Sequence, residues 1–230
     1  IQVHLGLCIK ESLDLNKAFI HRNITNKSFG VLKWAMSIDG RVGLKNGKSK
    51  WITNEESRSF VHSLRAEFDA IIIGGNTLRK DNPLLTSRAS KNKEPLRVVF
   101  TKTLDLPAKS NLWDCNVAQT LVVYDASTAN EEFLAKIPKC VEVAKVSEDN
   151  PELISKLLAK RGCNKVLWEC GPKLATSAVK AGCINEIISF IAPKILGGEN
   201  NMNPLGDFEF NEMHEIIKLN ESQFSLIDND

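Results

Sequence analysis

The 230-residue sequence predicts an α/β fold with three layers and a mainly parallel sheet. Apolar runs such as Ala70 to Ile73 are continuous rather than alternating, which is typical of strands buried on both faces of a parallel sheet. These runs alternate with segments that carry helix start and end signals. Hydrophobic residues make up 43% of the chain, enough to bury a substantial core, which excludes intrinsic disorder as its main state.

The elements are expected in a regular order along the chain. An amphipathic helix lies within residues 13–20, before the main domain. Strands are expected at residues 31–36, 69–73, 96–100, 121–124, 165–170 and 186–192. Helices are expected at about residues 53–68, 150–162 and 173–181, and the segment 101–116 is irregular. The tail from residue 209 to 227 alternates weakly between apolar and polar residues, which indicates two further edge strands.

Two of the helices have explicit start signals. Thr53 and Glu56 have the spacing of a capping box, with Thr53 as the N-cap. Asn150 and Pro151 are residue types preferred at an N-cap and at the first helical position. The first of these helices is expected to bury one face, made of Phe60, Val61, Leu64 and Phe68.

Charge, cysteine and histidine content argue against several classes of protein. With 30 Lys and Arg against 28 Asp and Glu, the net charge is +2, which disfavours a dedicated nucleic-acid-binding protein. No apolar run approaches the ~18 residues that span a membrane. The six cysteines and four histidines show no metal-ligand spacing, so we expect reduced thiols, no metal site and no Ser-His-Asp triad.

The strongest local motif begins at the end of the expected strand 165–170. This strand brings Glu169 to the edge of the sheet where ligands bind in parallel α/β folds. Gly171 follows and frees the backbone, and a helix then begins whose first amides are suited to a phosphate. Thr176 and Ser177 lie early in this helix and can add hydroxyl groups. The alternative is an ordinary strand–helix connection, and the G-x-G-x-x-G fingerprint of a dinucleotide site is absent.

A second motif begins at Gly74 and Gly75, directly after a buried strand. Thr77 and Asp81 are four residues apart, so a helical turn places both on one face, where the carboxylate can hold ribose hydroxyls. Arg88 can bind a phosphate through two parallel hydrogen bonds. The alternative for this stretch is a solvated surface loop.

A third motif runs from Lys33 to Trp51. Lys33 interrupts an apolar strand, where a cation is unfavourable unless it is paired or functional. The alternative for Lys33 is an edge strand with the ammonium group in water. Asp39 and Gly40 have the composition of a tight turn. Trp51 is expected either to stack on a ligand ring or, as is more common, to fill the core.

In this order and spacing, the motifs resemble the reductase domain of the riboflavin-biosynthesis bifunctional deaminase–reductase family, and most closely its plant-type members. The matching segments are residues 33–40, 49–53, 65, 69–70, 74–77, 81–88, 169–172 and 192–197. The resemblance covers about residues 29–227 and implies a dihydrofolate-reductase-like fold. Residues 29–230 are therefore expected to form the reductase domain, and residues 1–28 an arm or a remnant of the junction to a deaminase domain. The deaminase zinc signature, H-x-E with P-C-x-x-C, is absent.

The resemblance also implies a reaction and its ligands. NADPH would deliver hydride to C1′ of 5-amino-6-(5-phosphoribosylamino)uracil and give the 5-phosphoribitylamino compound. The residues facing NADPH would be Ala35, Trp51, Thr77, Asp81 and the loop of Gly171, Pro172, Lys173, Leu174, Ala175, Thr176 and Ser177. Those facing the phosphorylated pyrimidine substrate would be Ser49, Arg65, Leu85, Arg88 and Glu169.

Within this set, we expect Arg65 and Arg88 to hold the 5′-phosphate. Lys33 and Glu169 are the candidate catalytic residues. Glu169 would hold sugar hydroxyls or assist proton movement. Lys33 would stabilise charge, with water as the proton source.

One position departs from the family pattern. The family usually has Asp-Ser after the strand that ends at Phe100, whereas this chain has Thr101 and Lys102. Lys102 is therefore expected either to contact the 2′-phosphate of NADPH or to mark a different cofactor preference.

Alternatives stay open at this point. One is a reductase that acts on the undeaminated pyrimidinone, or a folate-type reductase on the same fold. Another is a non-catalytic nucleotide-binding module. The family implies a homodimer, for which residues 187–192 are a candidate pairing strand, and further fused domains in the full-length protein. No nucleic-acid or membrane partner is expected, and the compartment is the cytoplasm or the plastid stroma.

Overall fold

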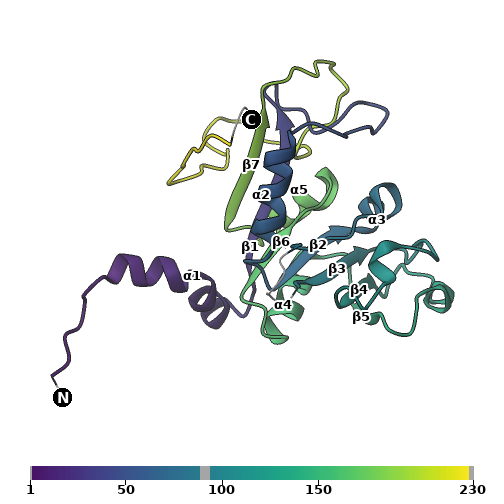
Figure 1. The fold of residues 1–230 in the computed structure, drawn as a ribbon, viewed down its shortest axis with the longest axis horizontal. Coiled ribbons are helices and arrows are strands. Elements are labelled where there is room, and N and C mark those ends of the chain that lie inside the picture. Colours follow the sequence, from purple (N-terminus) through teal and green to yellow (C-terminus); the bar gives the residue numbers. More distant parts are fainter. Residues whose placement is uncertain (1, 89–93, 228–230) are drawn as a thin grey trace.

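Seven strands of the described residues form one sheet in the order β5-β4-β3-β2-β6-β1-β7 (Figure 1). The computed structural model describes residues 2–88 and 94–227. The strands are β1 (Phe29–Ser37), β2 (Ala70–Gly74), β3 (Leu96–Thr101), β4 (Thr120–Asp125), β5 (Glu142–Val146), β6 (Lys165–Trp168) and β7 (Glu186–Ala192). The helices are α1 (Ile9–Thr25), α2 (Glu55–Arg65), α3 (Gly75–Asp81), α4 (Pro151–Lys160) and α5 (Pro172–Lys180), with short 3-10 helices η1 (Asn111–Trp113) and η2 (Glu131–Lys136).

The predicted three-layer, mainly parallel α/β architecture is confirmed. All six strand pairings are parallel. All six strands predicted between residues 31 and 192 are present, and the sequence prediction missed only β5 among the strands that the structure describes. β5 has the sequence Glu-Val-Ala-Lys-Val and lies at the edge of the sheet with most of its side chains exposed, so it lacks a continuous apolar run.

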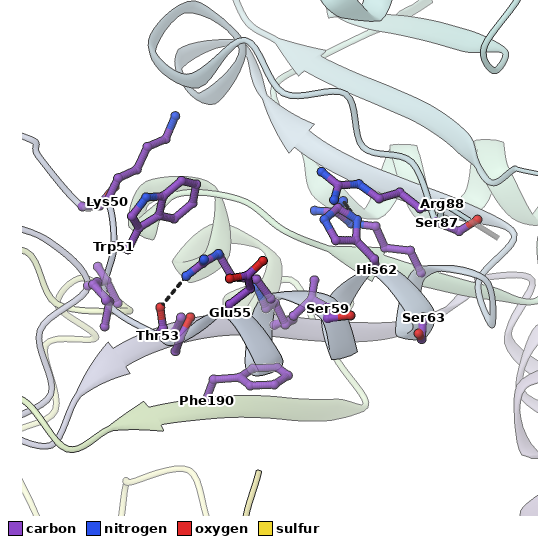
Figure 2. Close-up of a pocket in the computed structure, with 18 residues that line it drawn as sticks. Lys50, Trp51, Thr53, Glu55, Ser59, His62, Ser63, Ser87, Arg88 and Phe190 are labelled. Atoms are coloured by element: carbon purple, nitrogen blue, oxygen red, sulfur yellow. Dashed lines mark hydrogen bonds between the residues drawn. The ribbon is translucent and has the colours of Figure 1, made fainter. Parts of the chain in front are cut away.

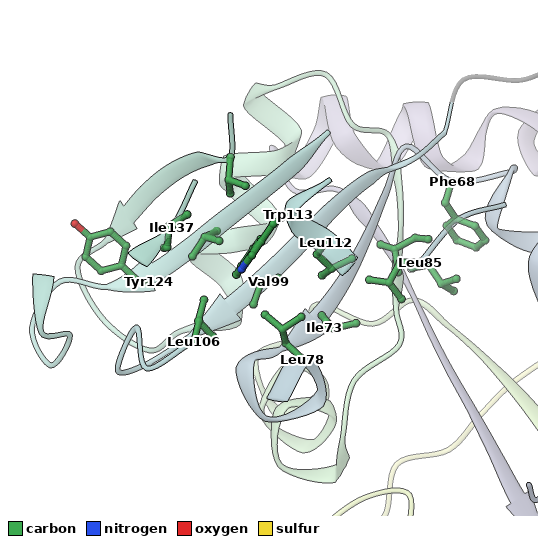
Figure 3. Close-up of a cluster of buried hydrophobic side chains, with 14 of the residues drawn as sticks. Phe68, Ile73, Leu78, Leu85, Val99, Leu106, Leu112, Trp113, Tyr124 and Ile137 are labelled. Carbon is green, nitrogen blue, oxygen red and sulfur yellow. The ribbon is translucent and has the colours of Figure 1, made fainter. Parts of the chain in front are cut away.

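Two apolar clusters lie on opposite faces of the sheet. Ile71, Ile73 and Val99 pack on the side of Leu64 from α2 and Leu78 from α3 (Figure 3). The intervening residues pack on the other side, against α4 and α5: they include Ile72, Val98, Ile154, Leu158 and Ala175. Because successive strand residues point to opposite faces and both faces are covered, the strands are apolar without interruption.

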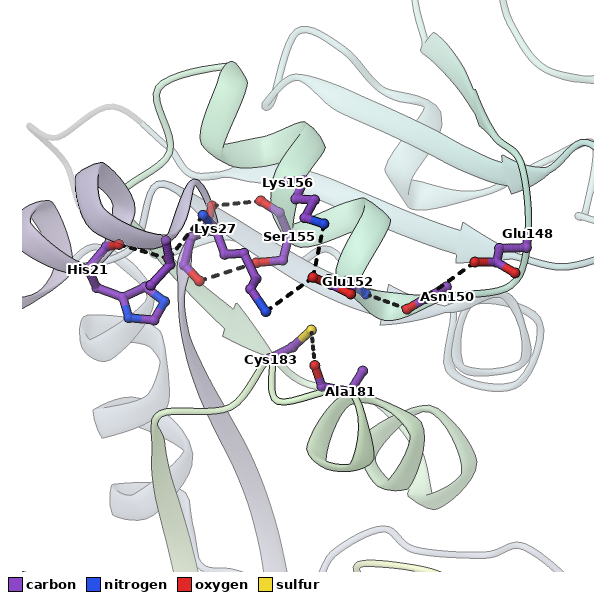
Figure 4. A network of polar contacts seen from close by, with 11 residues as sticks. His21, Lys27, Glu148, Asn150, Glu152, Ser155, Lys156, Ala181 and Cys183 are labelled. Carbon is purple, nitrogen blue, oxygen red and sulfur yellow. Dashed lines mark hydrogen bonds and ion pairs between the residues drawn. The ribbon is translucent and has the colours of Figure 1, made fainter.

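The start of α4 is fixed by the contacts that the sequence predicts. Asn150 is the N-cap and accepts a hydrogen bond from the amide of Glu152 at 2.9 Å, with Pro151 first in the helix (Figure 4). The Glu152 carboxylate pairs with Lys27 at 3.2 Å and with Lys156 at 3.0 Å. Lys27 precedes β1, so this network joins α4 to the first strand of the sheet.

The prediction for the start of α2 is wrong by one residue. The N-cap is Asn54, whose Oδ1 accepts a hydrogen bond from the amide of Ser57 at 2.8 Å. Thr53 therefore lies outside the helix, and Glu56 is one position too early to complete a capping box. Asn and Thr both serve as N-caps, which is why spacing alone selected the wrong one.

The predicted buried face of α2 is only partly confirmed. Val61 and Leu64 are buried, whereas the side chain of Phe60 is 48% exposed. Phe68 is buried but follows the helix, which ends at Arg65. Phe60 instead packs edge-on against Phe190 of β7, with the ring centroids 6.0 Å apart.

The two ends of the described chain lie outside the layers. The helix predicted within residues 13–20 is present as the longer α1, and none of its residues is buried (Figure 1). The two edge strands predicted within residues 209–227 are wrong: the structure has no strand in this segment. Its apolar side chains, among them Met213, Phe224 and Leu226, are exposed, so their alternation has no partner strand to pack against.

The six cysteines are free thiols in the structure. Cys163 and Cys183 are buried. The Sγ atoms of Cys115 and Cys140 are 2.7 Å apart, and burial together with this contact raises the pKa of Cys115 to about 11. No helix within residues 2–88 and 94–227 is both long enough and apolar enough to cross a bilayer.

Removing the true N-cap of α2 is expected to destabilise the protein. Asn54→Ala should lower the free energy of unfolding by about 1 kcal/mol, because the Ser57 amide loses its partner. The Tm should fall by about 2–4 °C in a scanning calorimeter. Glu56→Ala is the control and should change stability by less than about 0.5 kcal/mol. A larger loss in the Glu56 variant would restore the capping-box assignment.

Candidate functional site

The register of β1 and β6 places Lys33 and Glu169 side by side on one face of the sheet. Leu32 and Trp168 are paired across these two strands, and both belong to the core on the α4 and α5 side. The next residue of each strand points to the opposite face. Lys33 and Glu169 therefore face α2, which supplies Arg65 from its last turn.

Arg65 and Glu169 form a two-pronged ion pair. Nε of Arg65 donates to Oε1 at 2.6 Å, and Nη2 donates to Oε2 at 3.0 Å. Nη1 of Arg65 donates to the carbonyl oxygen of Thr86 at 3.1 Å. Nζ of Lys33 lies 3.8 Å from Oε2 of Glu169. All three charged side chains are 11–14% exposed, so the cluster is nearly buried and carries a net charge of +1 if all are ionised.

Burial and charge act in opposite directions on these groups. Burial alone would raise the pKa of Glu169, but Arg65 and Lys33 outweigh it and bring this pKa below its ordinary value. Burial lowers the pKa of Lys33 and Arg65 lowers it further, while Glu169 opposes both. Glu169 is therefore a carboxylate at neutral pH, and Lys33 holds its proton less tightly than a solvent-exposed lysine. The solvated-edge alternative for Lys33 is wrong, because β1 lies between β6 and β7.

A cavity of about 750 Å³ opens in front of this cluster (Figure 2). Its walls come from α2, the loop at residues 49–53, residues 87–88 and the β1 and β7 strands. Six of the predicted site residues line it: Lys33, Ala35, Ser49, Trp51, Arg65 and Arg88. Glu169 lies behind Lys33 and Arg65, and Leu85 is buried, 3% exposed, outside the lining.

Trp51 does not fill the core. Its side chain is 65% exposed at the rim of the cavity. The guanidinium carbon of Arg58 lies 4.4 Å from the centroid of its ring, and Arg58 also donates to the carbonyl of Thr53 at 2.8 Å. Nζ of Lys50 lies 5.9 Å from the same ring centroid, so two cations lie near an indole that is still largely exposed, and an exposed aromatic ring suits stacking on a planar ligand.

Sequence reasoning missed other residues of the cavity. His62 and Arg58 of α2 line it, as does Phe190 of β7. Arg58, His62 and Arg65 are spaced at i, i+4 and i+7, so one helix face carries all three. This spacing is the signal in the sequence that identifies the face.

The remaining predicted residues lie along the same strand ends, outside this cavity. Thr77 and Asp81 are on α3, four residues apart as expected. Asp81 pairs with Lys50 at 3.9 Å, which joins α3 to the loop that carries Trp51. Lys102 follows β3 with its side chain 57% exposed, and its Nζ is 4.0 Å from Asp149.

The start of α5 presents free backbone amides rather than hydroxyl groups. Thr176 donates to the carbonyl of Pro172 at 2.7 Å and accepts from the amide of Gly206, and Ser177 donates to the carbonyl of Lys173 at 3.1 Å. Ala175 is 1% exposed within the core, and Leu174 packs against it. The amides of the first turn have no partner within the helix.

Gly171 is the N-cap of α5 and is open on its outer side. Its φ of −71° and ψ of 167° are available to any residue, and a Cβ built on it would meet no atom within 4 Å. A Cβ at Gly74 would lie 3.6 Å from Leu174, so the starts of α3 and α5 are adjacent. The positive ends of two helix dipoles therefore lie next to each other.

Comparisons with known proteins agree on one family. The family model described as "RibD C-terminal domain" matches residues 28–230. The chain is 39% identical to riboflavin biosynthesis protein RibD of Synechocystis sp., over 95% of the chain and 60% of that protein. It is 40% identical to riboflavin biosynthesis protein PYRR, chloroplastic, of Arabidopsis thaliana, over 91% of the chain and 35% of that protein. The chain therefore spans about a third to three fifths of these relatives.

Solved structures agree with the fold. Acinetobacter baumannii RibD superposes with a TM-score of 0.85 at 25% identity, over the whole chain and 63% of that structure. A Thermotoga maritima structure, a diaminohydroxyphosphoribosylaminopyrimidine deaminase/5-amino-6-(5-phosphoribosylamino)uracil reductase, gives 0.75 at 27% identity, over 90% of the chain and 57% of that structure. The predicted dihydrofolate-reductase-like α/β fold is confirmed.

Replacing Glu169 by Gln is expected to destabilise the protein by about 3 kcal/mol at neutral pH, because two buried cations lose their counter-charge. The pKa of Glu169 is lower in the folded than in the unfolded state. Its stabilising effect is therefore present above the unfolded-state pKa and is lost as the pH falls through the folded-state pKa. Urea unfolding at a series of pH values should show the difference between wild type and variant shrinking in acid.

The matched control is Glu67→Gln. Glu67 pairs with Lys165 at 3.9 Å, but its side chain is 64% exposed. This change should cost less than about 1 kcal/mol. If the two substitutions lowered the free energy of unfolding equally, burial of the Glu169 cluster would add nothing to the strength of its ion pairs.

Proposed function

The chain belongs to the RibD C-terminal domain family, and from this premise we propose that it reduces 5-amino-6-(5-phosphoribosylamino)uracil to the 5-phosphoribitylamino compound with NADPH. The observation that carries the proposal is the buried Lys33–Glu169–Arg65 cluster at the wall of a cationic cavity. Such a cluster suits a site that binds an anionic sugar and stabilises the charge that develops at its anomeric carbon. The Thermotoga maritima relative is named for this reductase activity.

The cavity has the groups that this substrate requires. Arg88 is exposed at its rim and can bind a phosphate bidentately, and Ser49 adds a hydroxyl group. The exposed ring of Trp51 can stack on a planar ring. A volume of about 750 Å³ is within the range of pockets that bind small molecules and cofactors.

The start of α5 fits a nicotinamide dinucleotide. The open side of Gly171 and the free amides of the first helical turn can receive its pyrophosphate. Asp81 can hold ribose hydroxyls, and Lys102 a 2′-phosphate, at the neighbouring strand ends. When bound, the nicotinamide supplies a hydride.

Each residue of the cluster then has its own role. Arg65 holds the Glu169 carboxylate in one orientation through two hydrogen bonds. Glu169 in turn positions a sugar hydroxyl group, and Lys33 Nζ stabilises negative charge that develops when hydride reaches C1′. Water supplies the proton that the released nitrogen or oxygen atom needs. Because Lys33 is nearly buried, its charge acts with little screening.

A turnover assay tests this function. The deaminated substrate is generated in situ, and NADPH loss is followed at 340 nm, with the undeaminated pyrimidinone and with NADH in parallel. Oxidation of NADPH with the deaminated substrate alone is expected. Oxidation of NADPH with the undeaminated compound alone would show that the chain reduces this compound instead. NADPH binding without turnover of either compound would favour a non-catalytic nucleotide-binding module.

Lys33→Met is expected to lower kcat by about 100-fold or more, because it removes the only positive charge placed to act at C1′ in this proposal. Lys165→Met is the matched control. Like Lys33, Lys165 lies on a strand, and a carboxylate oxygen lies 3.9 Å from its Nζ. An aromatic ring also lies next to its ammonium group. Lys165 differs from Lys33 in its place, because it lies at the opposite end of β6. Near-normal turnover of the Lys33 variant would remove Lys33 from the mechanism.

Lys102→Ala is expected to raise the KM for NADPH about tenfold and to leave the KM for NADH unchanged, because only NADPH carries the 2′-phosphate. Lys109→Ala, which removes an exposed lysine at the other end of the following loop, is the control. If the KM for NADPH and the KM for NADH changed equally in the Lys102 variant, Lys102 would not bind the 2′-phosphate.

Three further points follow from the family. We propose residues 29–230 as the reductase domain and residues 1–28 as the arm that leads to it, supported by the absence of buried residues in α1. A homodimer is proposed, with the edge strand β7 as the candidate contact. The plastid stroma and the cytoplasm are both proposed compartments; the name of the plant relative supports the first.

A further inference from the structure

Two free cysteines, Cys115 and Cys140, are in direct contact before the strands β4 and β5 at one edge of the sheet. Their Sγ atoms are 2.7 Å apart. The carbonyl oxygen of Trp113 lies 3.7 Å from Sγ of Cys115 and 3.6 Å from Sγ of Cys140, so both thiol groups converge on it. Sulfur atoms in a disulfide are about 2.05 Å apart, so an approach of less than about 1 Å would join these side chains.

The buried Arg97 fixes the backbone on both sides of Cys115. Nη2 of its guanidinium donates to three carbonyl oxygens, those of Leu112, Asp114 and Ala118, at 2.6–3.0 Å. The side chain of Arg97 is 0% exposed, so these hydrogen bonds are shielded from water. The segment that carries Cys115 is therefore anchored to the sheet.

Cys140 lies in a tight turn with a hydrogen bond of its own. The amide of Val141 donates to the carbonyl oxygen of Pro138 at 2.9 Å, and the side chain of Val141 is buried. Cys140 itself is exposed, whereas Cys115 is half-buried. Two anchored segments thus hold the thiols against each other, and solvent reaches one of them.

We propose that Cys115 and Cys140 form a redox modification site, at which exchange with an external disulfide produces a disulfide that stabilises this edge of the sheet. Cys140 attacks one sulfur of the external disulfide as a thiolate, a mixed disulfide forms and one external thiolate leaves. Cys115 then loses its proton and attacks Sγ of Cys140, and the second external thiolate leaves. The two cysteines lose two electrons, the external disulfide gains them, and the two cysteine protons end on the released thiols.

The contact between the thiols favours the second exchange over a lasting mixed disulfide. The attacking sulfur is held beside its target, so this step is intramolecular and has a high effective concentration. Cys8 is also exposed, but it has no sulfur contact in the part of the chain that the structure describes. The same reagent should therefore leave Cys8 as a mixed disulfide.

The pKa of Cys115 determines which step is slow. Burial is the largest cause that raises this pKa to about 11, and the contact with Cys140 adds to it. Cys115 is therefore a neutral thiol at neutral pH. Because the thiolate is the attacking species, closure of the disulfide should become about tenfold faster with each pH unit below this pKa.

The disulfide would stabilise a weakly covered edge of the sheet. Its two cysteines are 25 residues apart in the chain, and the loop between them contains β4 and η2. β5, which follows Cys140, is the edge strand and has most of its side chains exposed. Closing a loop of this length lowers the conformational entropy of the unfolded chain. The inference does not depend on the proposed function.

The first test is a disulfide map of the wild-type chain. Reduced protein is treated with glutathione disulfide at mildly alkaline pH, and its peptides are analysed by mass spectrometry with and without dithiothreitol. The expected product joins the peptides of Cys115 and Cys140, has lost two hydrogen atoms and is reversed by dithiothreitol, while Cys8 carries glutathione. A lasting glutathione adduct at Cys140 beside a free Cys115 would overturn the inference, as would no reaction at either cysteine.

Two single variants test the order of the steps. Cys115→Ser should accumulate a stable glutathione adduct at Cys140. Cys140→Ser should leave Cys115 unmodified over the same time, because this thiol is half-buried and its pKa is raised. Rapid modification of Cys115 in the second variant would overturn the assignment of Cys140 as the first nucleophile.

Calorimetry tests the effect on stability. The Tm of the oxidised wild type should lie about 5 °C or more above that of the reduced protein. Cys140→Ser, treated with glutathione disulfide in the same way, is the matched control: it carries the same adduct at Cys8 and should show no rise. An unchanged Tm in protein that carries the mapped disulfide would overturn the stabilising role.

Discussion

The burial of the Glu169 carboxylate is the constraint on which the rest of the site depends. A carboxylate that is 11% exposed is tolerated only with cations beside it, and Arg65 and Lys33 supply two. Arg65 has to come from a helix that crosses this face of the sheet, and Lys33 from the adjacent strand. One ion cluster therefore determines how α2, β1 and β6 meet, and the cavity is the space left in front of it.

The same cluster explains why the whole-chain charge says little about the site. The formal charge of the chain is only +2, yet one cavity wall gathers Arg58, His62, Arg65 and Arg88 with Lys33 behind them. The Glu169 carboxylate behind this wall is held by Arg65, and Glu55 is the carboxylate among the residues that line the cavity. Local field depends on where charges lie and not on their sum, so a nearly neutral protein can offer a strongly cationic site.

The sequence predicts the sheet better than the site, for a physical reason. A strand covered on both faces must be apolar throughout, and this signal found every described strand except β5, whose exposed edge position removes it. The contact between residues 65 and 169 spans elements far apart in the chain, and no local periodicity records it. Lys33 and Glu169 each stand out in the sequence, one within an apolar strand and the other at a strand end, but only the register of β1 and β6 brings them together.

Two glycines at neighbouring strand ends differ in whether the packing around them requires glycine. A Cβ at Gly75 would lie 3.1 Å from Thr101 Oγ1 and 3.3 Å from Leu106, so the packing of α3 on β3 accounts for this glycine. At Gly171 the backbone angles suit any residue and a Cβ would meet nothing. Neither conformation nor packing requires glycine there, which agrees with the proposal that a ligand approaches this backbone from outside. Glu169 lies only two residues earlier, so the same turn joins the open helix start to the cationic cavity, as a reaction between two bound molecules requires.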